Sequence, residues 1–301
     1  PALASRQPAV TRLLVGATPG GGTDILARAL SLELSARLGW QFVVENKPGA
    51  AGNIAAQETA RAAPDGGTLL LSYTSHAINA SIYPDLAFDP VKDFTAIYGI
   101  ARSPAFLVAS PRLGVKTLRE MIAMAKREPG KLNMAIGGLG TSNHLAGEVL
   151  KRDAGLDIVG VPYKGASPAM ADVAAGHVHL GFGNVAGAQQ QVRDGALIAL
   201  GVTSAERLPD FPDVPAIGEV LPGYESSAWF GLFGPAGMDA ALVERIAQAT
   251  EQALTSPAMR ERMAADNMMP LALGPDAFKD FVISEIDKWG AIVRATGAKA
   301  Q

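Results

Sequence analysis

The sequence predicts an α/β protein of two domains that are joined by two extended crossovers. Short apolar strands alternate with amphipathic helices in two separate blocks of the chain, which is typical of parallel sheets with helices on both faces. Each block also contains a glycine-rich turn that runs from a strand directly into a helix. At 301 residues the chain is long for one domain and comfortable for two.

The first block predicts alternating strands and helices before its pattern changes. Strands are expected at residues 10–15, 42–44 and 68–73, and helices at residues 23–38 and 54–62. Prolines then punctuate two extended segments, at residues 94–100 and 105–110.

The second block opens with Thr117-Leu118-Arg119-Glu120, a capping box that predicts the start of a helix. Ser167 followed by Pro168 predicts an N-cap with proline at the first helical position. Hydrophobic periodicity then predicts strands at residues 132–136, 158–161, 178–182 and 197–202, and helices at residues 141–151 and 168–175.

After an extended passage at residues 229–234 the sequence predicts only helices. The clearest covers residues 276–293, where Phe281 and Trp289 share an apolar stripe and are expected in the core. With crossovers near residues 101–109 and 226–233, these helices would return to the first domain. We therefore expect domain 1 to comprise residues 1–103 and 229–301, domain 2 to comprise residues 104–228, and a ligand cleft to lie between them.

Composition argues against several functions. The formal net charge of −3 gives no electrostatic reason to expect nucleic acid or an anionic membrane as a partner. The chain has no cysteine, which removes thiolate chemistry, disulfides and cysteine-based zinc sites. No apolar run approaches the roughly 18 residues that a membrane span requires. The first five residues are typical of a chain cut just after a small-residue cleavage site, which favours a mature secreted form that has lost its signal peptide.

The two glycine-rich turns are the strongest functional signal. They are Gly16-Ala17-Thr18-Pro19-Gly20-Gly21-Gly22-Thr23-Asp24 and Gly137-Gly138-Leu139-Gly140-Thr141-Ser142-Asn143-His144. A strand, a glycine turn and a helix N-terminus together offer several unpaired N–H groups to an anion, with the helix dipole behind them. Neither turn contains Lys or Arg, so the sequence predicts a cleft that holds a small anionic molecule from two sides with neutral donors.

Several of these residues also have a purely structural interpretation. Thr23 and Asp24, or Thr141 and Ser142, could be N-caps, a role that is compatible with a ligand contact because both use the same donors. The segment Tyr73-Thr74-Ser75-His76 ends a predicted strand, so its hydroxyls are either ligand donors or parts of a capped turn. Lys164 is either an anion partner or a solvated loop lysine.

Enzymatic and cofactor signals are weak. The segment Gly181-Phe182-Gly183-Asn184-Val185-Ala186 imitates a dinucleotide fingerprint, but it lies late in the chain and the expected acidic residue is missing, so we expect no cofactor. No Walker lysine and no Gly-x-Ser-x-Gly elbow occur. His177 and His179 lack a third ligand, so we expect no metal. We expect no catalytic residue; Asp24 with His76 or His144 is the one pairing that an enzyme could use.

The sequence resembles the TctC/Bug family, the extracytoplasmic solute-binding proteins of tripartite tricarboxylate transporters. The resemblance lies in the first glycine turn, in Val44-Glu45-Asn46-Lys47-Pro48-Gly49-Ala50-Ala51-Gly52-Asn53, in the second glycine turn, in Val161-Pro162-Tyr163-Lys164-Gly165-Ala166-Ser167-Pro168-Ala169, in Thr203-Ser204 and in Trp229-Phe230-Gly231-Leu232-Phe233-Gly234-Pro235-Ala236-Gly237. It covers nearly the whole chain, in order and with matching spacing.

The resemblance implies a periplasmic, two-lobed protein with the type II periplasmic-binding fold, whose lobes close over a small carboxylate or amino acid. In the first domain it implies ligand contacts at Thr18, Gly20, Gly21, Asp24, Tyr73, Thr74, Ser75 and His76. In the second domain it implies contacts at Gly138, Gly140, Thr141, Ser142, His144, Tyr163, Gly183 and Asn184. Loop backbone and hydroxyl groups typically bind the ligand carboxylate in this family, often through ordered waters.

Two departures from the family pattern bear on the ligand. Family members often have an aromatic residue where Ala17 stands, and an acidic residue where Gly183 stands. Because an acid would suit an ammonium group, its absence favours a dicarboxylic acid or an acid with an uncharged tail over an amino acid. The resemblance further implies a monomer that does no chemistry and whose closed form meets membrane transporter subunits. Two alternatives remain. The closed form could meet a sensor kinase instead of a transporter, or the protein could be a two-domain enzyme that acts on a small carboxylate.

Overall fold

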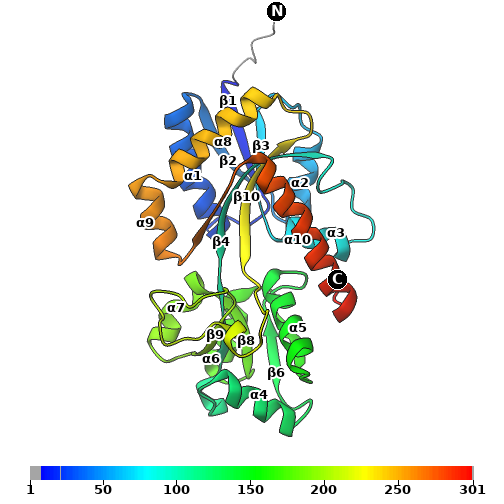
Figure 1. Ribbon diagram of the computed structural model, residues 1–301, viewed down its shortest axis with the longest axis vertical. Coiled ribbons are helices and arrows are strands. Elements are labelled where there is room, and N and C mark those ends of the chain that lie inside the picture. Colours follow the sequence, from blue (N-terminus) through cyan, green and yellow to red (C-terminus); the bar gives the residue numbers. More distant parts are fainter. Residues whose placement is uncertain (1–7, 21, 300–301) are drawn as a thin grey trace, which may run out of the picture. The chain divides into compact units, whose positions relative to one another are not determined.

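The structure, a computed structural model, describes residues 8–20 and 22–299 and has a mixed α/β fold with two sheets (Figure 1). The chain divides into two compact units. The first unit comprises the residues up to Arg102 together with Trp229–Ala291, and the second comprises Ser103–Ala228 together with the residues from Ile292 onward. No helix in the described part of the chain is both long enough and apolar enough to cross a membrane.

The first unit contains a six-stranded sheet in the order β11-β4-β10-β3-β1-β2. Its strands are β1 (Val10–Val15), β2 (Gln41–Asn46), β3 (Thr68–Tyr73), β4 (Phe94–Ser103), β10 (Ala228–Pro235) and β11 (Met269–Leu273). Strand β1 is parallel to both β2 and β3, whereas β10 is antiparallel to β3. The strands predicted at residues 10–15 and 68–73 are confirmed with the same bounds.

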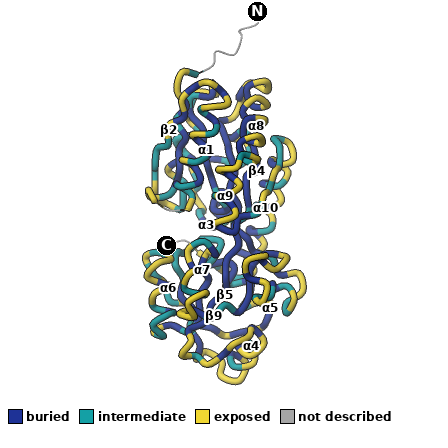
Figure 2. Tube along the Cα trace, turned by 90° about the vertical axis from the view of Figure 1, so that its left-hand side faces the viewer, coloured by how far each residue is buried: buried dark blue, intermediate teal, exposed yellow. Residues whose placement is uncertain are grey.

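Helices cover both faces of this sheet. They are α1 (Gly22–Leu38), α2 (Asn53–Ala60), α3 (Ser75–Ile82), α8 (Ala240–Leu254), α9 (Pro257–Ala265) and α10 (Pro275–Thr296). Figure 1 shows α1, α8 and α9 on one face of the sheet and α2, α3 and α10 on the other. The central strands β3 and β10 are buried along almost their whole length, whereas the edge strands β2 and β11 are mostly half-buried or exposed. Figure 2 shows many of the other exposed residues on the outer helices and loops.

The second unit contains a five-stranded sheet in the order β7-β6-β8-β5-β9. Its elements are β5 (Ala105–Ala109), α4 (Leu118–Arg127), β6 (Asn133–Ile136), α5 (Ser142–Ala154), β7 (Val159–Pro162), α6 (Ala166–Ala175), β8 (Leu180–Asn184), α7 (Val185–Arg193) and β9 (Ile198–Val202). Strand β6 is parallel to β7 and β8, and β5 is antiparallel to β8 and β9. Short 3-10 helices add Ala50–Gly52, Pro111–Leu113 and Ile217–Glu219.

Both sheets are mixed rather than purely parallel. The extended segments predicted as crossovers enter the sheets as strands: β4 and β10 pair within the first sheet, and β5 lies between β8 and β9 of the second. The prediction of helices only after residue 234 is wrong at β11, a short edge strand with a proline at its second position and an irregular register. The residues of β11 are all apolar, but Pro270 within so short a run argues against a strand in the sequence.

The helix start predicted at Thr117 is confirmed, whereas the start predicted at Ser167 needs correction. Thr117 caps α4 through a bond from the Glu120 N–H to its Oγ1 (3.1 Å), but the Glu120 carboxylate accepts from the Lys116 N–H (2.7 Å) instead of closing the capping box on Thr117. The N-cap predicted at Ser167 is wrong, because α6 already begins at Ala166 after Gly165, whose φ of 140° is open to glycine.

A buried carboxylate fixes the start of β10 in the first unit. The indole Nε1 atoms of Trp229 and Trp289 both donate to Glu285 Oε2, at 3.0 and 2.8 Å. The Trp229 N–H donates to Thr74 Oγ1 at 2.8 Å, which joins β10 to the end of β3. Trp289 is a core residue as predicted, and the half-buried Phe281 packs edge-on against Trp229.

Glycine at position 231 of β10 makes room for the ring of Phe278, which is fully buried. A Cβ on Gly231 would overlap that ring, so Gly231→Ala is expected to destabilise the protein by about 2–3 kcal/mol. Gly187→Ala is the control, because a Cβ in this turn of α7 meets nothing within 4 Å. Urea unfolding of both variants checks the prediction, and equal stability of the two would contradict it.

Candidate functional site

The parallel strands bring one set of loops to a single edge of each sheet. In the first unit, the adjacent strands β2, β1 and β3 are followed by α2, α1 and α3. In the second unit, the adjacent strands β7, β6 and β8 are followed by α6, α5 and α7. Because parallel strands share a direction, each unit gathers three βα loops and three helix N-termini at the C-terminal ends of these strands. We call this end of each sheet its carboxyl edge.

Asp24 organises the first βα loop of the first unit. Its Oδ2 accepts hydrogen bonds from the Gly20 N–H (2.9 Å) and from Arg28 Nε (3.0 Å), and its Oδ1 accepts from Asn46 Nδ2 (2.9 Å). These bonds, that of Arg28 first, lower the pKa of the carboxyl to about 2. Since Asp24 is 2% exposed and both oxygens are engaged, its clearest role is to hold the loop.

The tip of this loop is open to solvent. Thr18 and Gly20 are exposed, and Gly20 has a φ of 83°. Gly21, also predicted to contact a ligand, lies outside the described residues. Direct ligand contact by Thr18, Gly20 and Asp24 stays a prediction.

The second loop of the first unit has four successive residues in the left-handed region. Their φ angles are 126° at Gly49, 47° at Ala50, 53° at Ala51 and 89° at Gly52. An alanine in this region is strained because its Cβ lies too close to the backbone, whereas a glycine has no Cβ. The turn is held from below by Asn79, whose Nδ2 donates to the Ala51 carbonyl at 3.0 Å.

The first two loops touch through their backbones. A Cβ on Gly16 would lie 2.5 Å from the Gly52 Cα, so glycine is needed at this approach. The Tyr73 hydroxyl, at the end of β3, donates to the Gly16 carbonyl at 3.2 Å. Tyr73 therefore ties the third loop to the first, and burial raises its pKa to about 12.

The four predicted residues of the third loop point in different directions. The Thr74 hydroxyl accepts from the Trp229 N–H, and Ser75 is buried in the first turn of α3. The turn predicted here is in fact the start of that helix. The sequence analysis did not predict helix α3, although Thr74 is of a residue type that is favoured at N-caps; in the structure its side chain makes no capping bond.

His76 lies in an aromatic cluster of the core instead of at the loop edge. Its ring stacks on Phe233 (centroids 4.6 Å apart) and on Phe88, and meets the edge of Phe94. Nε2 is bonded to the Pro90 carbonyl at 2.8 Å, and Nδ1 is buried without a partner among the described residues. His76 is therefore buried, and ligand contact by this residue stays a prediction. Its hydrogen-bond partner is the Pro90 carbonyl, whereas Asp24 is bonded to Gly20, Arg28 and Asn46.

Burial lowers the pKa of His76 to about 4, from an ordinary 6.5. The folded state therefore binds this proton less readily than the unfolded state does, so stability is full above pH 6.5 and is lost as the pH falls to 4. The difference corresponds to about 3 kcal/mol. In His76→Phe, urea unfolding between pH 7 and pH 4 is expected to show a loss smaller by about this amount. An unchanged pH dependence would contradict the assignment.

The second unit builds its central loop around His144. The Gly140 N–H donates to His144 Nδ1 at 3.1 Å, so the ring is neutral with its hydrogen on Nε2. Burial lowers the pKa of His144, which keeps this acceptor free of a proton. Thr141 caps α5: its Oγ1 accepts from the His144 N–H at 3.3 Å and donates to the Gly138 carbonyl at 2.7 Å.

The other predicted residues of the second unit differ in accessibility. Asn184 is exposed at the end of β8, where its Oδ1 accepts from Asn143 Nδ2 at 3.1 Å. The Tyr163 hydroxyl donates to Asp172 Oδ2 at 2.7 Å, so its hydrogen is already used. Gly183 is buried, and a Cβ there would lie 2.7 Å from Met170 Sδ. A side chain at position 183 would therefore require Met170 to move.

Most of the helix N-termini at these edges are not capped by side chains. Helices α2, α3, α6 and α7 have no side-chain cap, whereas Thr141 caps α5. Uncapped N–H groups and the positive ends of helix dipoles favour an anion. Lys164 is exposed beside this edge, and its contact with a ligand stays open.

Sequence reasoning missed the residues that support the loops. Asn46 donates to the Ala17 carbonyl at 3.0 Å as well as to Asp24, and Asn79 supports the left-handed turn. Gly165 lies against Gly137, since a Cβ on Gly137 would be 2.9 Å from the Ala166 Cα. The signal available for Asn46 and Gly165 was their place within four residues of the end of a predicted strand, since loops at strand ends line the crevice of an open α/β sheet.

Ala51 offers a direct test of loop strain. Ala51→Gly is expected to stabilise the protein by about 0.5–1 kcal/mol, because glycine adopts a φ of 53° without steric cost. Ala291→Gly, on an exposed turn of α10, is the control and should cost about 1 kcal/mol. Urea unfolding measures both, and a loss of stability in Ala51→Gly would show that the turn is not strained.

The comparisons with known proteins agree with this geometry. A family model described as "Tripartite tricarboxylate transporter family receptor" matches residues 26–298. The chain belongs to this family. Of the similar solved structures, the periplasmic binding protein BugD is 29% identical, with a TM-score of 0.84, and the match covers 97% of this chain and 99% of BugD.

Two similar structures contain ligands. Rpa4515 of R. palustris, solved with adipate, is 32% identical, with a TM-score of 0.87 over 98% of this chain and 99% of that one. MatC of Rhodopseudomonas palustris, with bound malate, is 32% identical, with a TM-score of 0.83 over 95% of this chain and 99% of that one. The expected two-lobed periplasmic-binding fold and the resemblance to the TctC/Bug solute-binding proteins are thereby confirmed.

Proposed function

We propose that this protein binds a small dicarboxylate in the periplasm and delivers it to a tripartite tricarboxylate transporter. The observation that carries the proposal is the pair of carboxyl edges, each with three βα loops, helix N-termini and glycine turns but no salt-bridging base at the turns themselves. Donors of this kind suit a carboxylate and leave the solute free to exchange. One edge in each unit suits a solute with an acid at each end.

The similar proteins support the choice of ligand class. Rpa4515 was solved with adipate and MatC with malate, and both ligands are dicarboxylates. Gly183 adds to this, since it puts no acidic side chain, which would attract an ammonium group, at this position. The solute would then favour the closed arrangement of the two units by its higher affinity for that arrangement.

The geometry gives no support to an enzyme. Asp24 is held by Arg28, Gly20 and Asn46, while His76 is bonded to the Pro90 carbonyl in an aromatic cluster, so these two do not form an acid–base pair. In the second unit, Nδ1 of His144 is occupied by the Gly140 N–H. The other ring nitrogen, Nε2, lies 3.8 Å from Glu148 Oε1. The family is one of solute-binding proteins, which supports a binding role over an enzymatic one.

Adipate, malate and a matched monocarboxylate should be titrated into the protein by calorimetry and thermal shift. A solute at about 100 times its dissociation constant adds about 2.7 kcal/mol of stability, which shifts the unfolding temperature visibly. Dicarboxylates are expected to stabilise the protein and the monocarboxylate to do so less. Stabilisation by none of them would overturn the proposed ligand class.

Gly140→Val tests the loop directly. A branched side chain at a φ of 74° would displace the turn that presents the N–H groups, so dicarboxylate affinity should fall at least tenfold. Gly155→Val is the matched control, since Gly155 has a φ of 63° at the other end of α5, away from the loop. Equal loss of affinity in both variants would show that strain, not the loop, is responsible.

A further inference from the structure

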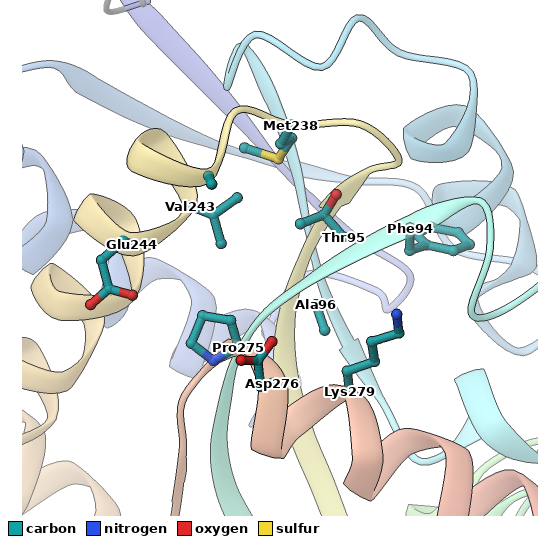
Figure 3. Close-up of a pocket in the computed structure, with 10 residues that line it drawn as sticks. Phe94, Thr95, Ala96, Met238, Val243, Glu244, Pro275, Asp276 and Lys279 are labelled. Carbon is teal, nitrogen blue, oxygen red and sulfur yellow. The ribbon is translucent and has the colours of Figure 1, made fainter.

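A groove in the first unit lies away from its βα loops. The first turns of α8 and α10 and the start of β4 bound it, and its volume is about 420 Å³ (Figure 3). Strand β10 starts beside the end of β3, with Phe230 opposite Tyr73, so its far end at Pro235 lies at the opposite edge of the sheet. Thr95 Oγ1 donates to the Pro235 carbonyl at 2.8 Å, which places the groove at that opposite edge.

The floor of the groove is apolar and fixed by packing. Phe94, Met238 and Val243 are buried there. Met238 folds back over Gly234, where a Cβ would overlap its sulfur. The Phe94 ring meets His76 edge-on at 4.8 Å. A floor held in this way is preformed for an apolar group of modest size.

The rim carries opposite charges side by side. Asp276 and Lys279 lie three residues apart in the first turns of α10, and Figure 3 shows both beside the groove. Within the part of the chain that the structure describes, neither forms a hydrogen bond or an ion pair with another residue. Glu244 adds a second carboxylate from α8, where it accepts from Gln248 Nε2 at 2.8 Å.

We propose that this groove binds an apolar α-amino acid in its zwitterionic form. The ammonium group would pair with Asp276, the carboxylate with Lys279, and the side chain would cover Met238 and Val243. Helix neighbours at i and i+3 have Cβ atoms about 5–6 Å apart, so their charges match a ligand whose two charged groups are attached to the same carbon. The volume falls within the range of small-molecule sites.

The charge pattern explains why the zwitterion is preferred over simpler ligands. A carboxylate without an amine would bring negative charge near Asp276 and Glu244, whereas an amine without a carboxylate would lie beside Lys279. Because exposed charge pairs on a helix contribute little by themselves, a ligand that contacts both residues does not have to break a strong bond between them.

Calorimetry with leucine, 4-methylpentanoate and 3-methylbutylamine tests the proposal, since the last two lack the amine and the carboxylate respectively. Leucine should bind at least tenfold more tightly than either. Asp276→Asn and Lys279→Met should each weaken leucine at least tenfold, and Asp287→Asn, an exposed acid farther along α10, should not. Ala240→Trp, which fills the groove from an exposed position, should also abolish binding.

Gly140→Val separates this site from the solute site, because it should keep full affinity for leucine while losing the dicarboxylate. The proposal is overturned if leucine does not bind, or if its affinity survives in Asp276→Asn, Lys279→Met and Ala240→Trp. It is equally overturned if Gly140→Val removes leucine binding, since leucine would then occupy the βα loops. Failure of dicarboxylate binding alone leaves this groove unaffected.

Discussion

The central loop of each unit depends on the same hydrogen bond. A glycine in the left-handed region donates its N–H to a side chain four residues later: Gly20 to Asp24 in the first unit, and Gly140 to His144 in the second. The bond closes the turn from within, so the glycine backbone is held while the helix begins. Without it, the turn would have to be fixed by the solute, and ordering it would weaken binding.

The parallel strands then place each of these turns between two other βα loops. Since β1 runs between β2 and β3, and β6 between β7 and β8, each central turn has a neighbouring βα loop on either side. The loops support one another directly, as in the approach of Gly16 to Gly52 and the bond from Tyr73 to Gly16. Backbone N–H groups are thus positioned by other backbone, which requires glycine at the closest contacts.

Strands, most helices and the glycine turns could be predicted because they depend on local patterns. The central strands of both sheets are short apolar runs between turn residues, and the turns carry glycines where φ is positive. The partners of these turns could not be predicted in the same way. Asn79 and Arg28 look like ordinary helical polar residues in the sequence, and only the fold shows that they hold Ala51 and Asp24.

The surroundings of His76 show what a single sequence leaves out. Its place shortly after β3 gave no sign that Phe88, Phe94 and Phe233, which lie farther along the chain, enclose its ring. Long-range contacts of this kind decide which side of α3 faces the core. The same lack of long-range information hid the edge strand β11, whose pairing with β4 decides its conformation.

The two central turns carry no net charge, for different reasons. A net negative charge at either turn would repel an anionic ligand. An unpaired Asp24 would repel a carboxylate, but Arg28 neutralises it and keeps its pKa near 2, so the turn does not change charge at ordinary pH. His144 is neutral because burial disfavours its protonated form. In each unit, the helix N-termini therefore keep their positive dipole ends next to a turn without net charge. Acid affects only one of them: a proton on Nδ1 of His144 removes the acceptor of Gly140, so the loop of the second unit loosens first as the pH falls.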